Sequence, residues 1–478
     1  MEHEHPDLSE RLAEFGVLPM FGFPTQSRYL FARRPVNARP WPPQSAVQRD
    51  LRMAVSEFAP GNEIVIDKMV YRSIGLIDIY PSRGQLDYYR DPFGEIRVVG
   101  LCERCKNVQE DPGEACDNCG AAGDDFRHVQ LCKPAGFRAE WTAGAPYDGS
   151  RERLSRASTP RLVVDRAAMP IETEDGGLSV RAGQTQLYTI NDNRGRAFEF
   201  QRSSQANGGW LEIGSFDDAR WVAGDGEIRE VVLGSVVTTD VLIAEPARPE
   251  GAEWTHLMFA HTEPGLAIVT ARRAAWTSLA FALRAAAADL LAIEPRELDA
   301  GMRLLATADR SNLYPEIFLT DVIENGAGYV TEIARPPRFV QLLDTMARLV
   351  ADWESSDHNC DAACYRCLKD WSNNPYHPLL DWRLAADTFE ILRYGRPVRD
   401  RWQRTRRAAI RAAEAAFEWS CRDPDSLEPV LDTHRDRVVR VIHPLRNHPE
   451  ALLGGGAQEV LADVFNFDRR PGQTYLAL

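Results

Sequence analysis

The sequence predicts a multidomain protein of the α/β and α+β classes, and three observations lead to this prediction. A chain of 478 residues is too long for one ordinary hydrophobic core, so two to four domains are expected. Residues 133–245 consist largely of short alternating runs that are typical of strands, whereas residues 274–293 form one long Ala/Leu-rich run that predicts a buried helix. Seven of the nine cysteines lie in two compact clusters.

The individual elements follow from local patterns. Residues 45–59 look helical, with Ser45 as the N-cap and the Pro60-Gly61 pair as the stop signal. Residues 63–81 alternate in polarity and are rich in β-branched side chains, so they predict strands. Residues 316–334 predict a strand, a glycine-containing turn and a helix, and residues 399–419 predict a helix with a basic first half. A short α/β tail is expected to follow.

Composition limits the classes of function. A hydrophobic content of 44% and a charged content of 26% are those of a soluble globular protein. No run approaches 18 consecutive apolar residues and the N-terminus is acidic, so we expect no membrane span, no secretory signal and a cytoplasmic location. A net charge of −14 argues against a protein that holds nucleic acid over its whole surface, because such binding depends on Lys and Arg. The charge favours a protein partner first and nucleic acid second.

The first cysteine cluster has the spacing of a zinc ribbon. Cys102, Cys105, Cys116 and Cys119 follow the pattern C-x2-C-x10-C-x2-C, in which each C-x2-C pair forms a tight knuckle. Residues 111–113, Asp-Pro-Gly, can turn the chain so that the two knuckles face each other. Four thiolates complete a tetrahedral zinc site and leave no open position, so the site is expected to be structural. The alternative is a loop of unligated thiols.

The second cluster offers five candidate ligands. His358, Cys360, Cys364 and Cys367 form the most compact set, and His377 is an alternative fourth ligand. Three thiolates damp the Lewis acidity of a metal, which favours a structural zinc over a catalytic one. A catalytic zinc, an iron–sulfur cluster and the absence of any metal remain alternatives. The sequence therefore predicts two zinc ions.

Three motifs resemble a known family: "ENGAGYV" (324–330), "HNCDAACYRCL" (358–368) and "DWSNNPYHPLLDWRLAAD" (370–387). They are similar to the helicase-associated zinc-binding domain of the MrfA type. That domain occurs at the C-terminus of superfamily 2 DNA helicases and in partner subunits of defence helicases, such as the DrmB-like subunit of the DISARM anti-phage system. The family pattern falls on Gly326, Ala327, Gly328, Cys360, Cys364, Cys367, Trp371, Asn373, His377, Leu380 and Asp381. His358 stands where the family commonly has a cysteine.

The N-terminal part adds to the resemblance. Residues 16–35 and 48–76 look like the segment that follows the second motor domain of such helicases. The resemblance and the patterns together imply five parts, which are a helicase-linker-like module (1–95), a zinc ribbon (96–132), a β-rich module (133–245), the MrfA-type domain (246–395) and a helical and α/β C-terminal extension (396–478). The chain has no G-x4-G-K-[ST] motif and no acidic Mg²⁺ box. We therefore expect no ATPase or nuclease activity and assign no catalytic residue.

The resemblance implies a non-catalytic, zinc-binding subunit of a bacterial DNA helicase complex in anti-phage defence. Its expected partners are a superfamily 2 helicase on another chain, DNA and further defence effectors, with no membrane. One alternative is an accessory protein of a DNA-repair helicase. Another is a zinc-dependent hydrolase or nuclease that uses the second cluster.

Three further features have competing interpretations. The "NGAGY" stretch could cradle a phosphate, but a tight turn is favoured because the lysine of a phosphate-binding loop is missing. His443 has no Asp or Ser partner at a telling spacing. A basic segment could contact the DNA backbone, with Trp402 as a stacking group, or it could be a solvated helix face with Trp402 packed inward. The arginines of this segment are Arg399, Arg401, Arg404, Arg406 and Arg407.

Overall fold

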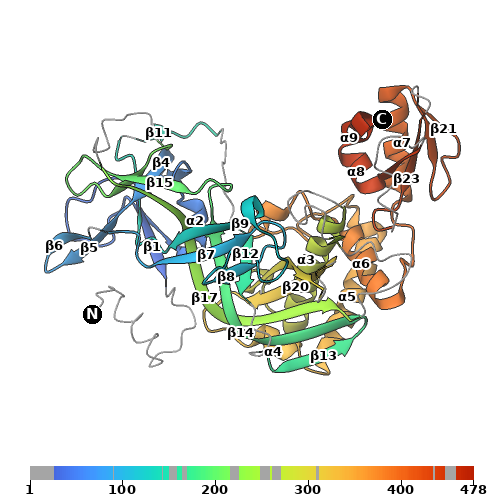
Figure 1. The fold of residues 1–478 in the computed structure, drawn as a ribbon, viewed down its shortest axis with the longest axis horizontal. Helices are drawn as coiled ribbons and strands as arrows, with labels where there is room; N and C mark the ends of the chain where they lie inside the picture. Colours follow the sequence, from blue (N-terminus) through green and yellow to red (C-terminus); the bar gives the residue numbers. More distant parts are fainter. Residues whose placement is uncertain are drawn as a thin grey trace.

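Two long antiparallel strands form the spine of the molecule (Figure 1). In the computed structural model, the structure describes residues 26–89, 91–142, 144–149, 159–163, 169–215, 226–247, 259–260, 271–307, 310, 312–433, 437–446 and 459–477. The two spine strands are β14 (Leu178–Asn191) and β17 (Ile228–Pro246), and they pair from Leu178 opposite Pro246 to Asn191 opposite Leu233. Both are rich in β-branched residues, which favour extended backbone.

The spine belongs to one large mixed sheet. Its other strands are β1 (Ser27–Phe31), β2 (Ala46–Asp50), β3 (Glu63–Ile66), β4 (Met69–Leu76), β7 (Ile96–Cys102), β8 (Val108–Glu110), β9 (Phe126–Cys132), β10 (Phe137–Ala139), β11 (Ala145–Pro146), β12 (Thr159–Val163), β13 (Ile171–Asp175), β15 (Phe198–Arg202), β16 (Trp210–Glu212), β18 (Phe259–Ala260), β19 (Leu298–Ala306) and β20 (Asn312–Asp321). A separate hairpin consists of β5 (Asp78–Ser82) and β6 (Gln85–Tyr89). The predicted strands in residues 63–81 are confirmed.

Strand β17 joins parts that are distant in sequence. Its N-terminal half pairs with β15 and runs parallel to β9, whereas its C-terminal half pairs antiparallel with β20. One strand therefore crosses from the N-terminal strands and the first cysteine cluster to the α/β part of the chain, as Figure 1 shows.

The helix predicted over residues 45–59 is partly wrong. Residues 46–50 form β2, which pairs antiparallel with β1, and only α2 (Leu51–Glu57) is helical. The Asp50 side chain accepts a hydrogen bond from the Arg52 amide at 2.9 Å, so Asp50 rather than Ser45 caps the helix. Pairing with β1 provides the backbone hydrogen bonds that the first residues would otherwise make within a helix.

The α/β part is built around α3 (Ala271–Leu291), which packs against β19 and β20 and against the helices α5 (Arg338–Glu354) and α6 (Trp382–Tyr394). The prediction of a buried helix over residues 274–293 is confirmed. This helix has the length and mean hydropathy (1.2) to cross a membrane, but 78% of the apolar stretch is buried inside the protein. The short helix α4 (Tyr329–Ile333) follows the glycine-containing turn after β20, as predicted.

The C-terminal part lies beyond α6 (Figure 1). It contains α7 (Gln403–Phe417), the strands β21 (Ser420–Cys421), β22 (Val430–Asp432), β23 (Val438–Ile442) and β24 (Glu459–Asp463), and the helices α8 (Val464–Arg469) and α9 (Pro471–Ala477). The predicted helix over residues 399–419 begins four residues later than expected. Residues 399–402 instead form a turn in which Asp400 accepts a hydrogen bond from the Trp402 amide at 3.2 Å.

Candidate metal centres

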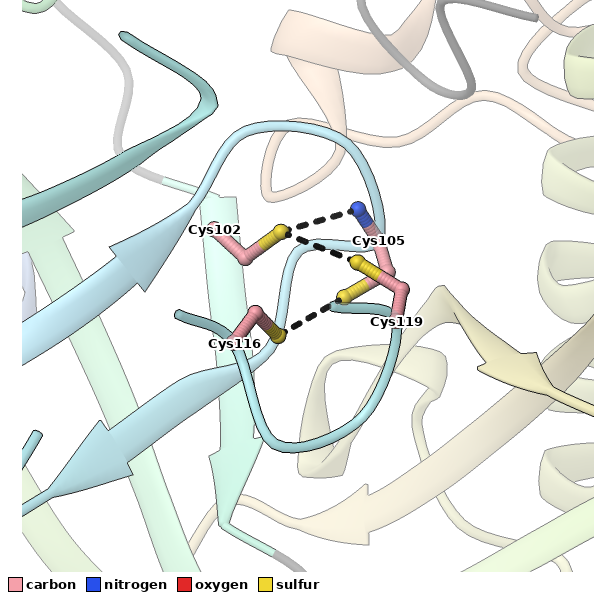
Figure 2. Close-up of side chains that lie close together, drawn as sticks. All are labelled: Cys102, Cys105, Cys116 and Cys119. Atoms are coloured by element: carbon pink, nitrogen blue, oxygen red, sulfur yellow. Dashed lines mark hydrogen bonds between the residues drawn. The ribbon is translucent and has the colours of Figure 1, made fainter. Parts of the chain in front are cut away.

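The first cysteine cluster has the geometry of a tetrahedral zinc site (Figure 2). The Sγ atoms of Cys102 and Cys119 lie 3.6 Å apart, and those of Cys105 and Cys116 lie 3.7 Å apart. A tetrahedron with Zn–S bonds of about 2.3 Å has S–S edges of about 3.8 Å. All four thiols are free of disulfides and at most 1% exposed. The donor set and its spacing therefore fit Zn²⁺.

The electrostatics of this cluster require a cation if all four thiols are to ionise. Hydrogen bonds to the other thiols and burial raise the pKa of Cys105, whereas hydrogen bonds from Cys102 and Cys105 lower the pKa of Cys116. Several thiolates this close repel one another, so without a cation ionisation of one thiol opposes ionisation of its neighbours. A bound dication would remove this conflict and hold the knuckles together.

Local structure places the two knuckles. Cys102 ends β7 and Cys105 follows in the turn to β8, so the first knuckle is the tip of a hairpin. The second knuckle closes through two backbone hydrogen bonds of 2.8 Å, from the Cys116 amide to the Ala121 carbonyl and from the Gly120 amide to the Cys116 carbonyl. Gly120 has a φ of +72°, which favours glycine.

Both knuckles dock on β19 of the α/β part. The Leu304 amide donates to the Cys105 carbonyl at 3.1 Å, which joins the first knuckle to the strand. Asn118 in the second knuckle donates from Nδ2 to the Leu304 carbonyl at 2.7 Å, and its Oδ1 accepts from the Ala306 amide at 3.0 Å. The first cysteine cluster is therefore packed against the neighbouring α/β part of the protein.

The second cluster also groups four ligands. The Sγ atoms of Cys364 and Cys367 are 3.7 Å apart, and Cys364 Sγ lies 3.5 Å from His358 Nε2. These atoms and Cys360 Sγ all lie within 4.8 Å of one another. His358 Nδ1 lies 2.9 Å from the Trp353 carbonyl, so Nδ1 carries the proton and Nε2 presents its lone pair to the thiols. This second hydrogen bond is typical of a zinc-binding histidine.

His377, the alternative fourth ligand, lies outside this group. Its Nε2 atom is 3.0 Å from the Asp370 carbonyl and 2.9 Å from Asn373 Oδ1. Burial and the nearby Lys369 lower its pKa, which favours the neutral ring. The structure therefore brings together His358 and the three cysteines, and gives His377 a role in holding the loop that follows.

That loop is held by residues of the family motif. Asn373 is 1% exposed and donates from Nδ2 to the Leu368 carbonyl at 2.7 Å. Asp381 caps α6 by accepting from the Arg383 amide at 3.0 Å. The Trp382 indole donates to the Cys360 carbonyl at 2.9 Å and so ties α6 to the knuckle. Of these residues, Trp382 contacts a candidate metal ligand directly, whereas Asn373 and Asp381 hold the loop and the start of α6.

Sequence reasoning missed a buried arginine beside this loop. Arg284 on α3 is 3% exposed, forms an ion pair with Asp370 and donates to Ser372 Oγ at 3.2 Å. Burial lowers the pKa of Arg284 to about 10. An arginine inside the Ala/Leu run of a buried helix was the signal that could have revealed it, because a buried charge requires a partner.

The glycine-containing turn is a tight turn, as the favoured interpretation predicted. Asp321 accepts hydrogen bonds from the amides of Ala327 at 2.7 Å and of Tyr329 and Val330 at 3.1 Å. Asp240 Oδ2 accepts from the Gly328 amide at 3.1 Å. Two carboxylates therefore occupy the amides that a phosphate would need, and their charge would repel it.

The basic segment divides into buried and exposed arginines. Arg401 and Arg406 have side chains only 3% and 4% exposed, and both are engaged by acidic residues. Arg399, Arg404 and Arg407 keep side chains that are 68%, 80% and 43% exposed, although each also has an acidic neighbour. Only these three are accessible to a DNA backbone, whose contact with this segment stays a prediction. Trp402 is fully buried, as the alternative interpretation expected.

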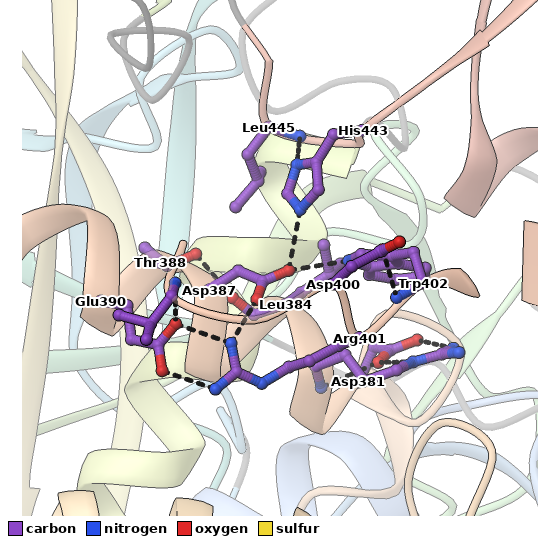
Figure 3. Close-up of polar contacts among 12 residues, drawn as sticks. Asp381, Leu384, Asp387, Thr388, Glu390, Asp400, Arg401, Trp402, His443 and Leu445 are labelled. Atoms are coloured by element: carbon purple, nitrogen blue, oxygen red, sulfur yellow. Dashed lines mark hydrogen bonds and ion pairs between the residues drawn. The ribbon is translucent and has the colours of Figure 1, made fainter. Parts of the chain in front are cut away.

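Arg401 and Trp402 meet at a buried carboxylate (Figure 3). Asp387 on α6 accepts from Arg401 Nη1 and from the Trp402 indole, each at 2.7 Å, and lies 3.0 Å from His443 Nε2. The other ring nitrogen of His443 accepts from the Leu445 amide at 3.1 Å. His443 therefore has an aspartate partner that sequence spacing did not indicate. Both of its ring nitrogens are engaged, and the side chain joins the C-terminal part to α6.

A comparison with known protein families supports zinc binding by the second cluster. Residues 279–368 match the MrfA Zn-binding domain, a stretch that includes most of α3 and the second cluster. The Druantia protein DruE of Escherichia coli (strain UMEA 4076-1) is 25% identical over 429 residues, which cover 83% of this chain and 22% of that protein. The chain thus spans about a fifth of the length of this relative.

Two solved structures of the DUF1998 helicase MrfA also align with the chain. The DNA-bound structure has a TM-score of 0.29 at 12% identity, covering 61% of this chain and 35% of that one. The structure with DNA and AMPPNP has a TM-score of 0.24 at 10% identity, covering 64% and 34%. The assignment of a zinc-binding domain depends on the domain match and on the geometry of the second cluster, and not on these two solved structures. The similarity to a known family therefore applies to residues 279–368, which match the MrfA Zn-binding domain and include the second cluster.

Proposed function

We propose that this chain is a non-catalytic, zinc-stabilised subunit of a DNA helicase complex, and that it works in the bacterial cytoplasm with a superfamily 2 motor encoded on another chain. The match of residues 279–368 to the MrfA Zn-binding domain carries this proposal. The motor motifs that such a domain accompanies are missing from the sequence. The chain would complete the motor, contribute to DNA binding and connect ATP-driven movement to further effector subunits.

Anti-phage defence is the favoured setting. The motifs around the second cluster resemble those in subunits of defence helicases, and a relative that aligns over 83% of the chain is a Druantia protein. A repair helicase accessory with the same architecture is the second candidate. The genes beside its own would distinguish defence from repair.

The geometry of both clusters supports a structural role for zinc. Each cluster supplies four protein ligands, and a tetrahedral ion with four protein ligands has no position for the water that a hydrolase would activate. A histidine and an aspartate also form catalytic dyads, but both ring nitrogens of His443 are engaged, one by Asp387 and the other by the Leu445 amide. A zinc-dependent hydrolase or nuclease is therefore the less favoured alternative.

Affinity purification of the tagged chain from its native host, followed by mass spectrometry, tests the proposal. We expect a superfamily 2 helicase to co-purify at about equal amounts, and we expect the interaction to survive nuclease treatment. A Cys364→Ser variant should lose zinc, and the helicase should not co-purify with it. The helicase should still co-purify with His377→Ala. A chain that purifies alone, with full zinc content, would contradict the proposal.

A further inference from the structure

A charged cavity of about 330 Å³ lies beside the first cysteine cluster. It opens between the first knuckle, β12 and the turn that joins β14 to β15. Its volume is near the lower end of small-molecule sites, which span roughly 300–1,000 Å³. The residues that line it are Glu103, Lys106, Arg127, Arg161, Ile190, Asp192, Arg194 and Gly195.

The lining of the cavity is cationic in a protein that is acidic overall. Four of the lining side chains are cations and two are anions, which gives a formal charge of +2, whereas the whole chain carries −14. Ile190 is the one large apolar side chain in the lining. A polar, cationic lining of this kind selects an anion over an apolar ligand.

One carboxylate pre-organises three of the cations. Glu103 Oε2 lies 2.5 Å from Lys106 Nζ, and Glu103 Oε1 lies 3.2 Å from a guanidinium nitrogen of both Arg127 and Arg161. Arg161 is 8% exposed and also donates to the Cys102 carbonyl at 3.3 Å, so the cavity wall is tied to a zinc ligand. Asp192 also pairs with Arg127, so two carboxylates hold these three cations in place and leave one positive charge uncompensated.

The remaining cation is at the mouth of the cavity. Arg194 lies in the turn after β14, is exposed, and forms no ion pair or hydrogen bond within the part of the chain that the structure describes. The same turn is fixed by Arg127, which donates to Asp192 Oδ2 at 2.7 Å and to the Gly195 carbonyl at 2.9 Å. A guanidinium that is free to move beside fixed cations can close on a ligand phosphate by charge-assisted hydrogen bonds.

We propose that this cavity is a phosphate-binding site that takes a backbone phosphate of nucleic acid, with Lys106, Arg127 and Arg161 as its fixed wall and Arg194 as its mobile contact. The assignment to nucleic acid rests on the proposed function, whereas the anion site itself rests on the cavity and its charges. The ribbon would then place the nucleic acid against the structural core, because its knuckles dock on β19.

Two binding measurements on the purified, zinc-loaded chain test the proposal. The first follows the anisotropy of labelled single-stranded and duplex oligonucleotides between about 50 and 200 mM salt. The second follows thermal unfolding with pyrophosphate against chloride at matched ionic strength, because a bound ligand stabilises the folded state. Arg194→Glu is the test variant. Arg196→Glu is the matched control, since Arg196 is exposed in the same turn and does not line the cavity.

We expect Arg194→Glu to weaken oligonucleotide binding roughly 5- to 10-fold at low salt and to reduce the salt dependence by about one phosphate contact. It should also abolish the stabilisation by pyrophosphate, and Arg196→Glu should change neither. Lys106→Gln, checked for full zinc content, should cause both losses as well, because Lys106 belongs to the fixed part of the lining.

Three results would overturn the proposal, and they separate it from the proposed function. Equal oligonucleotide binding by the wild type, Arg194→Glu and Lys106→Gln would show that the cavity does not bind the nucleic acid. The proposed function as a DNA-binding helicase subunit would be unaffected by this result. Stabilisation by pyrophosphate that Arg194→Glu abolishes, without any oligonucleotide binding, would assign the site to a free phosphate compound instead. Absence of both effects in the wild type would refute an anion site, while helicase co-purification would still judge the function independently.

Discussion

Replacing Arg401 with methionine is expected to destabilise the junction between α6 and the C-terminal part of the chain. The Arg401 guanidinium forms ion pairs with Glu354, Asp387 and Glu390. The exposed fractions of the arginine and of Asp387 are 3% and 0%. Burial works against the charge of Arg401, but hydrogen bonds to Glu390 and Asp387 raise its pKa above the usual value. Methionine keeps most of the side-chain volume and removes the charge.

The magnitude follows from the carboxylates that would lose their partner. Removing one member of a buried ion pair typically costs about 3–5 kcal/mol, because the other charge is left without compensation. Arg399 provides the matched control two residues earlier, since it pairs with the same Glu354 at 2.5 Å but its side chain is 68% exposed. An exposed pair contributes about 0–1 kcal/mol, so Arg399→Met should have little effect.

Hydrogen exchange measured by mass spectrometry resolves this junction in a multidomain protein, where one global unfolding transition is not expected. Peptides from α6 and α7 should exchange about 100-fold faster or more in Arg401→Met, because each 1.4 kcal/mol changes an opening equilibrium about tenfold. Peptides from the β14–β17 spine should be unchanged. Equal protection of α6 in the Arg401→Met and Arg399→Met variants would show that the buried network does not stabilise the junction.

Three other predictions concern metal content, the glycine turn and acid stability. Inductively coupled plasma mass spectrometry should find about two zinc ions per chain in the wild type and about one in Cys364→Ser. A His377→Ala protein that contains only one zinc ion would disprove the choice of His358 as the fourth ligand. Gly326→Ala should lower the free energy of unfolding by about 1–3 kcal/mol, because the residue has a φ of +76° and the added Cβ would lie 2.1 Å from Asp240 Oδ2. Gly113→Ala is the control, since no atom lies within 4 Å of its added Cβ and its melting temperature should match that of the wild type. Equal melting temperatures for the two variants would contradict this account. Although burial opposes ionisation, the Arg406 guanidinium lowers the pKa of Asp400 below its ordinary value of 3.8. The ionised carboxylate therefore stabilises the fold above the ordinary pKa, and this stability is lost as the pH falls through the lowered pKa. Asp400→Asn should be less stable than the wild type at pH 7, and a stability difference between them that persists in strong acid would count against the ion pair.

The sequence alone determined the features that depend on local spacing. The C-x2-C pairs predicted that the first four cysteines would converge, because a knuckle brings together two thiols that are three residues apart. The long Ala/Leu run specified α3, since a helix that is apolar on most faces must be buried. The motifs from residue 324 to residue 387 indicated the MrfA-type zinc-binding domain, and residues 279–368 match that domain.

The tertiary structure decided the features that depend on partners far apart in the chain. Only packing shows that residues 46–50 pair with β1 instead of extending α2, because a strand partner competes with the helix for the same backbone groups. His358 rather than His377 joins the cysteines because the Trp353 carbonyl orients its ring. The sequence did not distinguish the buried arginines of the basic segment from the exposed ones. Arg401 is buried because carboxylates that lie 11 to 47 positions away in the sequence surround its guanidinium. Local patterns fix what a segment can form, whereas burial and charge pairing across the fold decide what each side chain does there.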